Sequence, residues 1–211
     1  MIFADREDAG RRMARALHKY AGGEAVVLAI PRGGVIVGRA VADELGAPLD
    51  VVIPRKVGAP GNPELGLGAI APGVRVLDEG LIRSLGVSDE YLERAIEAEE
   101  REIERRSATY RAGRPPIDLR GKTAIVVDDG MATGGTAIAA VRWAKAQGAA
   151  RVILAVPVAP PAAVSRLHLE ADDVVALSTP DAFYAVGQWY GRFDQVSDRE
   201  VVDAMSEARP A

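Results

Sequence analysis

The chain has 211 residues, of which 48% are hydrophobic and 27% charged, an ordinary balance for one globular domain. A net charge of -4 argues against a general nucleic-acid binder, and the absence of cysteine excludes disulfides, thiolate metal sites and thiol catalysis. The first residues, MIFADRED, lack the pattern of a secretion signal, and no run of about 18 apolar residues exists to span a membrane. We therefore expect a cytoplasmic protein, one domain over 1–211, with neither nucleic-acid nor membrane partners.

Short runs rich in Val and Ile alternate with helix-like stretches along most of the chain. This alternation predicts right-handed crossover connections and an α/β fold: an open, mostly parallel twisted sheet flanked by helices, with a core of about 24–180. The predicted strands are Glu24–Ile30, Leu49–Pro54, Lys122–Asp128, Arg151–Pro157 and Val174–Leu177. The predicted helices are Asp8–Tyr20, Val35–Leu45, Gly134–Gln147 and Pro161–Leu169.

The segment RKVGAPGNPELGLGAIAPG, from Arg55 to Gly73, interrupts the alternation. A stretch this rich in Gly and Pro predicts a structureless functional lid or a linker, flexible over about 55–67. Within it, Gly66–Ala71 has the composition of a short strand.

Two further segments complete the predicted domain. Ser88 is a helix N-cap, and it begins a helical arm of about 88–111 that is either a solvated surface helix or a contact in a homodimer. A C-terminal hood of about 181–211 ends in a helix from Asp198 to about Glu207, because Ser197 and Glu200 form a capping box at its start. The aromatic cluster in the hood either stacks a substrate ring or, as we favour, forms a small core under the last helix. Its members are Phe183, Tyr184, Trp189, Tyr190 and Phe193.

The clearest chemical signal is KTAIVVDDGMATGGTAIAAV, which begins at Lys122. Its apolar run predicts a buried strand that ends in Asp128 and Asp129, and a loop of small residues leads into a helix at Thr136. Ligands of open parallel sheets bind at the carboxyl ends of the strands, and main-chain N–H groups at a helix start favour an anion. Two carboxylates cannot bind the same phosphate, but they suit hydroxyl groups or a chelated metal beside it. The pattern therefore indicates a ribose 5-phosphate.

The sequence IVVDDGMATGGT resembles the signature with which type I phosphoribosyltransferases bind 5-phosphoribosyl 1-pyrophosphate (PRPP). The resemblance implies that Asp128 and Asp129 hold the 2- and 3-hydroxyls of the ribose. It also implies that residues 132–136 surround the 5-phosphate. The substrate-binding residues implied in this segment are Gly130, Met131, Ala132, Thr133, Gly134, Gly135 and Thr136.

Two other segments occupy places that the family uses for pyrophosphate. In IPRGG, after the first strand, Arg32, Gly33 and Gly34 are the implied pyrophosphate ligands. The segment Arg55–Leu67 lies where the family closes a mobile loop, so Arg55 or Lys56 is expected to reach the pyrophosphate. Lys56 is counted with Asp128 and Asp129 as catalytic.

The activity that the resemblance implies is transfer of the phosphoribosyl group from PRPP to a nitrogenous base or amine, with release of pyrophosphate. Mg²⁺ is the implied cofactor, held mainly by PRPP, with Asp128 or Asp129 contributing through water or through PRPP. The 6-oxopurine branch has an Asp where this chain has Ala132, so the acceptor stays open. A non-catalytic sensor of PRPP or a nucleotide is the alternative.

Two common nucleotide-binding motifs fit the sequence poorly. The spacing in RGGVIVG does not match the dinucleotide-binding G-x-G-x-x-G, and GMATGGT lacks the length and the Lys of a Walker loop. His18 and His168 are expected to be structural or solvated rather than catalytic.

Overall fold

The computed structural model describes residues 1–208, so the last three residues of the predicted hood lie outside the described part. Five parallel strands form the main sheet in the order β2-β1-β6-β7-β8, which confirms the predicted open parallel sheet. Its strands are β1 (Ala25–Ala29), β2 (Leu49–Val51), β6 (Thr123–Val127), β7 (Arg151–Val158) and β8 (Asp173–Ser178). The two strands β1 and β6 lie side by side at the centre of the sheet, and Ala29 is paired with Val127 where both end.

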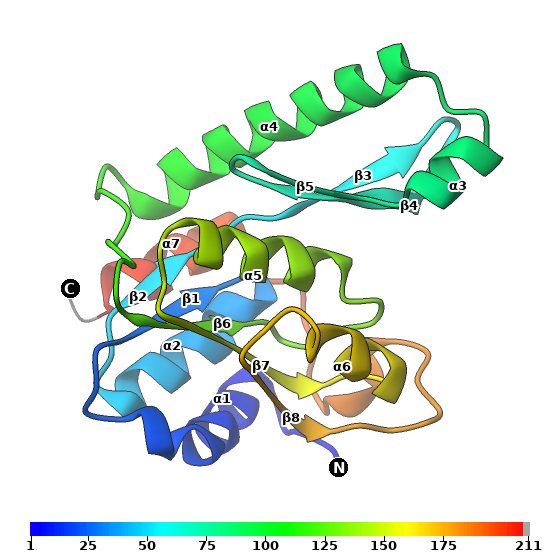
Figure 1. Ribbon diagram of the computed structural model, residues 1–211. Helices are drawn as coiled ribbons and strands as arrows, with labels where there is room; N and C mark the ends of the chain where they lie inside the picture. The colour runs from blue at the N-terminus through cyan, green and yellow to red at the C-terminus, as the bar shows by residue number, and fades with distance from the viewer. Residues whose placement is uncertain (209–211) are drawn as a thin grey trace.

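Helices cover both faces of this sheet (Figure 1). On one face lie α1 (Arg6–Ala16), followed by a 3-10 turn at His18–Tyr20, and α2 (Gly33–Leu45); on the other lie α5 (Gly135–Ala146) and α6 (Pro161–Leu167). Successive strand residues point to opposite faces, so Val27 packs in the core with α2, while Val26 packs in the core with α5. Burial of both faces explains why the central strands β1 and β6 are almost entirely apolar rather than alternating.

The segment predicted to be structureless forms a second, antiparallel sheet in the order β3-β4-β5. Its strands are β3 (Arg55–Ala59), β4 (Asn62–Ala71) and β5 (Val74–Leu77). The prediction of a structureless segment is therefore wrong for β3 and the first half of β4, whereas the short strand predicted at Gly66–Ala71 is confirmed as part of β4. Val57, Leu67 and Ile70 are buried, which offsets the entropy lost by ordering a Gly-rich chain. Gly68 is required by close packing, because a Cβ there would overlap the carbonyl oxygen of Val76.

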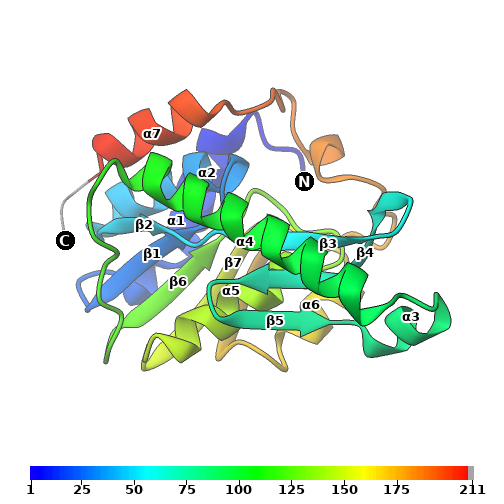
Figure 2. The ribbon, with the colours of Figure 1, turned by 90° about the horizontal axis from the view of Figure 1, so that it is seen from above.

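The helical arm covers this small sheet. The helix α4 (Asp89–Arg111) begins after Ser88, whose side chain accepts a hydrogen bond from the N–H of Tyr91, as the cap predicted. Figures 1 and 2 show the small sheet lying between α4 and α5. The short helix α3 (Glu79–Ser84), which connects β5 to the arm, was not predicted, although Asp78 caps it through the N–H of Leu81.

The C-terminal hood is tied to the start of the chain. It contains a 3-10 turn (Val186–Trp189) and α7 (Asp198–Ser206), which packs on α2 and α4. The N–H of Phe3 donates to the carbonyl oxygen of Trp189 at 2.8 Å, and the rings of Phe3 and Tyr190 are 5.4 Å apart. The favoured interpretation of the aromatic cluster as a small core is therefore confirmed. However, the core forms against Phe3 and Val158 rather than under the last helix, and Tyr184 is 85% exposed.

Within residues 1–208, no helix combines the length and the apolar composition needed to cross a bilayer.

Candidate active site

The two predicted acids lie directly after β6, at the carboxyl end of the central strands. Asp128 accepts a hydrogen bond from the main-chain N–H of Asp129 at 2.8 Å, and neither side chain is fully exposed. Burial, and then the nearby charge of Asp129, raise the pKa of Asp128 well above its usual value. Asp128 makes no ion pair within the described residues, whereas Asp129 does.

Asp129 is held by a residue that the sequence did not reveal. The Nε of Arg6, at the start of α1, donates to Oδ2 of Asp129 at 2.7 Å, and the two side chains are only 12% and 15% exposed. The hydroxyl of Tyr190 donates to the main-chain oxygen of Asp129 at 2.5 Å. Burial, with the negative charge of Asp129, raises the pKa of Tyr190, so this hydroxyl stays protonated as a donor. No local pattern marks Arg6, since its partner is 123 residues away.

The predicted pyrophosphate loop lies against the acid pair. It joins β1 to α2, and β1 is the neighbour of β6. A Cβ at Gly33 would overlap the carboxylate of Asp129, and a Cβ at Gly34 would lie 2.9 Å from the carbonyl oxygen of Val127. Only a residue without a Cβ allows the main chain to come this close to the end of β6. Gly33 and Gly34 therefore lie directly against both acids. The peptide bond between Pro31 and Arg32 is cis.

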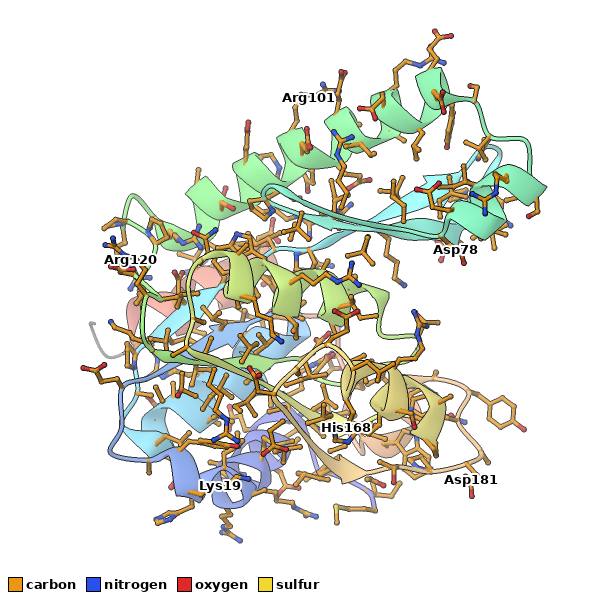
Figure 3. All side chains as sticks on the ribbon, in the orientation of Figure 1. Lys19, Asp78, Arg101, Arg120, His168 and Asp181 are labelled. Atoms are coloured by element: carbon orange, nitrogen blue, oxygen red, sulfur yellow. The ribbon has the colours of Figure 1, made fainter. Side chains whose placement is uncertain are left out.

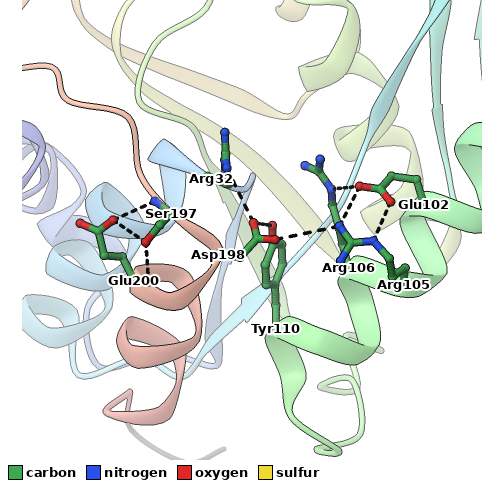
Figure 4. A network of polar contacts seen from close by, with 8 residues as sticks. All are labelled: Arg32, Glu102, Arg105, Arg106, Tyr110, Ser197, Asp198 and Glu200. Atoms are coloured by element: carbon green, nitrogen blue, oxygen red, sulfur yellow. Dashed lines mark hydrogen bonds and ion pairs between the residues drawn. The ribbon is translucent and has the colours of Figure 1, made fainter.

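Arg32 points from this loop into a network of polar groups between the arm and the hood (Figure 4). It lies 3.8 Å from Asp198, the first residue of α7, which also accepts a 2.7 Å hydrogen bond from the hydroxyl of Tyr110 on α4. Arg105 of α4 lies 4.0 Å from the same carboxylate. Burial, followed by the hydrogen bond to Asp198, raises the pKa of Tyr110 to about 12. Asp198 thus connects Arg32 to the arm.

The predicted phosphate loop presents unused main-chain donors. Within residues 1–208, the main-chain N–H groups of 132–137 make no hydrogen bond. The first N–H group of the helix that does is that of Ile138, which donates to the carbonyl oxygen of Gly134. Gly134 has φ of +83°, and a Cβ at Gly135 would meet nothing within 4 Å. Ala132 and Thr133 are exposed, whereas Gly130 and Met131 are buried, and the N–H of Met131 donates to Val158. Open amides at a helix start form an anion site.

A cavity of 620 Å³ adjoins this loop, between it and the small sheet. Lys56 lines the cavity together with Thr133 and Gly135 of the loop, and so does Arg166 of α6, which donates to the carbonyl oxygen of Thr133 at 3.1 Å. Figure 3 labels Asp78, another lining residue, at the end of the small sheet near α3. Arg55, one position earlier on β3, instead makes a 2.6 Å ion pair with Glu99 of the arm. The strand thus directs Lys56, not Arg55, toward the loop.

The acid pair fits a metal ion only as a minor contributor of ligands. Within the described part of the chain, no group of three or more His, Asp or Glu side chains could hold a metal ion. Asp129 already carries Arg6 as its counter-charge. One or two carboxylate oxygens suit Mg²⁺ that keeps its waters and takes its other ligands from a phosphate-bearing substrate.

Neither histidine is buried in the structure. His18 and His168 are exposed, and Figure 3 labels His168, which follows α6. The expectation that they are solvated is therefore confirmed.

Comparison with known proteins defines the class to which this fold and loop belong. The family model described as "Phosphoribosyl transferase domain" matches residues 2–189, so the chain belongs to the phosphoribosyl transferase family. Two proteins from Mycobacterium tuberculosis strains, each named "Putative phosphoribosyl transferase", are 47% identical to it over 208 residues. That match covers 98% of this chain, but the chain spans only 47% of the length of those relatives.

Solved structures give the same fold. The crystal structure of TT1426 from Thermus thermophilus is 44% identical, covers 100% of both chains and superposes with a TM-score of 0.84. A hypothetical protein from Neisseria gonorrhoeae, solved with bound ppGpp, has a TM-score of 0.50 and 14% identity. That match covers 98% of this chain and 94% of the other. At 14% identity it shows the fold alone.

Proposed function

We propose that this domain binds PRPP with Mg²⁺ and transfers its phosphoribosyl group to a nitrogenous base or amine. The observation that carries the proposal is the row of unbonded main-chain N–H groups at 132–137, which begins a few residues after Asp128 and Asp129. An anion site next to two acids, at the end of a central strand, suits a sugar phosphate.

In this proposal each end of PRPP has its own set of residues. The loop from Ala132 to Thr136 holds the 5-phosphate. Lys56, which the sequence led us to expect at the pyrophosphate, instead supplies positive charge beside this loop together with Arg166, in a cavity wall that also carries acidic side chains. Asp128 and Asp129 accept hydrogen bonds from the ribose hydroxyls. The pyrophosphate lies along the main chain of 32–34, which the glycines allow to approach the acids closely.

The reaction forms one bond and breaks another at C1 of the ribose. The acceptor nitrogen bonds to C1, and the bond from C1 to the pyrophosphate oxygen breaks, with its electron pair leaving on pyrophosphate. The proton that the acceptor nitrogen gives up passes to the released pyrophosphate or to water. Mg²⁺, when bound with PRPP, neutralises charge on that leaving group. The residues of the chain orient the ribose and stabilise the developing charge, so catalysis is largely positioning and electrostatics. With alanine at 132, the loop offers the acceptor no acid or base at that position.

Pyrophosphate release tests the proposal directly. PRPP and Mg²⁺ are incubated with the protein and a panel of purines, pyrimidines and amines, and PRPP binding is measured by calorimetry on wild type and Asp129→Asn. We expect release with at least one acceptor and sharply weaker PRPP binding by the variant. Tight PRPP binding without release for any acceptor would favour the sensor. No PRPP binding by wild type would reject both the transfer reaction and a PRPP sensor. The homodimer and the cytoplasmic location remain predictions.

A further inference from the structure

Arg6 is fixed on three sides while it contacts the acid pair. Its Nε donates to Asp129, its Nη1 donates to the carbonyl oxygen of Asp194 at 2.8 Å, and its guanidinium lies 3.9 Å from the centre of the Phe193 ring. With 12% exposure, the side chain has little freedom to move away. Arg6 is therefore a built part of the site that joins α1, the acid pair and the hood.

We propose that Arg6 determines what the acid pair can bind: it keeps free divalent cations off Asp128 and Asp129 and leaves their remaining oxygen atoms to hydroxyl groups. The part about ribose hydroxyls rests on the proposed function, whereas the exclusion of metal does not.

The charge of the acid pair would attract a metal if Arg6 were absent. Two adjacent carboxylates that share no cation attract a divalent metal strongly, because oxygen ligands with full negative charge are those that Mg²⁺ and Mn²⁺ prefer. Within the described residues, Arg6 is the sole ion-pair partner of Asp129, and Asp128 has none. Arg6 therefore balances one of the two carboxylates and occupies a hydrogen-bonding position on Oδ2 of Asp129 that a metal would otherwise be able to use.

The geometry explains why the residue is arginine. A guanidinium can donate from Nε to one acceptor and from Nη1 to another while its flat face lies on an aromatic ring. A lysine ammonium would keep the charge but could not make these contacts together. Arg6→Lys therefore keeps the positive charge but loses the contacts that orient Asp129, whereas Arg6→Gln loses the charge. Comparing the two variants separates the effect of charge from that of orientation.

The test measures metal binding without PRPP. Mn²⁺ is titrated into the whole protein, and bound metal is followed by electron paramagnetic resonance for wild type, Arg6→Gln and Arg6→Lys. Arg11→Gln is the matched control, because it removes an equal charge from the same helix, where Arg11 is 50% exposed and lies 3.7 Å from Glu7. We expect Arg6→Gln to gain one Mn²⁺ site per chain, at least about tenfold tighter than any wild-type binding. Arg11→Gln and Arg6→Lys should gain none.

Two results would overturn the inference: a folded Arg6→Gln that binds Mn²⁺ no better than wild type, or a wild-type Mn²⁺ site that Asp129→Asn abolishes. The second result decides the matter even if Arg6→Gln does not fold. A gain that survives in the double variant Arg6→Gln, Asp129→Asn also counts against it, because the metal would then lie elsewhere. PRPP calorimetry on the same wild-type sample separates the two proposals, since absence of PRPP binding rejects the proposed function and leaves the metal result standing.

Discussion

Two neighbouring glycines in the phosphate loop should respond in opposite ways to replacement by alanine. Gly134 has φ of +83°, a conformation that costs a residue with a Cβ about 1 kcal/mol or more. Its Cβ would also lie 2.8 Å from Cδ2 of Leu167 and 3.1 Å from the sulfur of Met131. Moving the end of Leu167 adds about 1 kcal/mol, so Gly134→Ala should lower the free energy of unfolding by about 2 kcal/mol.

Gly135→Ala is the matched control, because its Cβ would meet nothing within 4 Å. Replacing a glycine at a permissive position reduces the entropy of the unfolded chain, so stability should stay within about 0.5 kcal/mol of wild type or rise slightly. The same methyl group lies on the side of the loop where we place the 5-phosphate. PRPP affinity should therefore fall about tenfold or more in Gly135→Ala without loss of stability.

Urea unfolding, followed by the fluorescence of the two tryptophans, measures the stabilities, and calorimetry with PRPP measures the affinities. A Gly134→Ala variant within about 0.5 kcal/mol of wild type, the scatter of neutral substitutions, would refute the assigned backbone conformation of the loop. A Gly135→Ala variant with unchanged PRPP affinity would refute the position of the phosphate.

Three further variants test separate features of the molecule. Since the pKa of Asp128 is raised above 3.8 in the folded protein, wild-type stability should fall as pH rises through that pKa. Asp128→Asn should therefore unfold at higher urea than wild type at pH 8, with little difference at low pH; parallel pH profiles would contradict this. Asp50→Ala breaks a buried 2.8 Å ion pair with Arg111, so it should lower the free energy of unfolding in urea by about 3 kcal/mol. A decrease of less than about 1 kcal/mol would contradict this prediction. Lys56→Ala should leave the melting temperature unchanged, since the side chain is exposed, but weaken PRPP binding by calorimetry; equal affinity would remove Lys56 from the site.

The parallel sheet could be predicted because its information is local. The strands β1, β6 and β7 are short apolar runs rich in Val and almost entirely buried, so their composition and length distinguish them from the helices. The phosphate loop could also be predicted, since a strand, two acids and a glycine-rich turn follow one another within about a dozen residues.

The small sheet and the contact with Arg6 could not be predicted in the same way. Residues 55–73 have the composition of a loop, and they form strands because α4 and α5 enclose them and bury side chains such as Val57 and Ile70. Tertiary packing here outweighs local propensity. Arg6 follows Asp5 as an ordinary first residue of a helix, and nothing nearby in the sequence points to Asp129. Contacts between distant segments require the fold before they can be identified.

Asp198 connects the helical arm to the loop that follows β1. One carboxylate receives Tyr110 and Arg105 from the arm and Arg32 from the loop after β1. Asp198 is therefore shared between the arm and the loop, and the position of Arg32 depends on a carboxylate that α4 also holds.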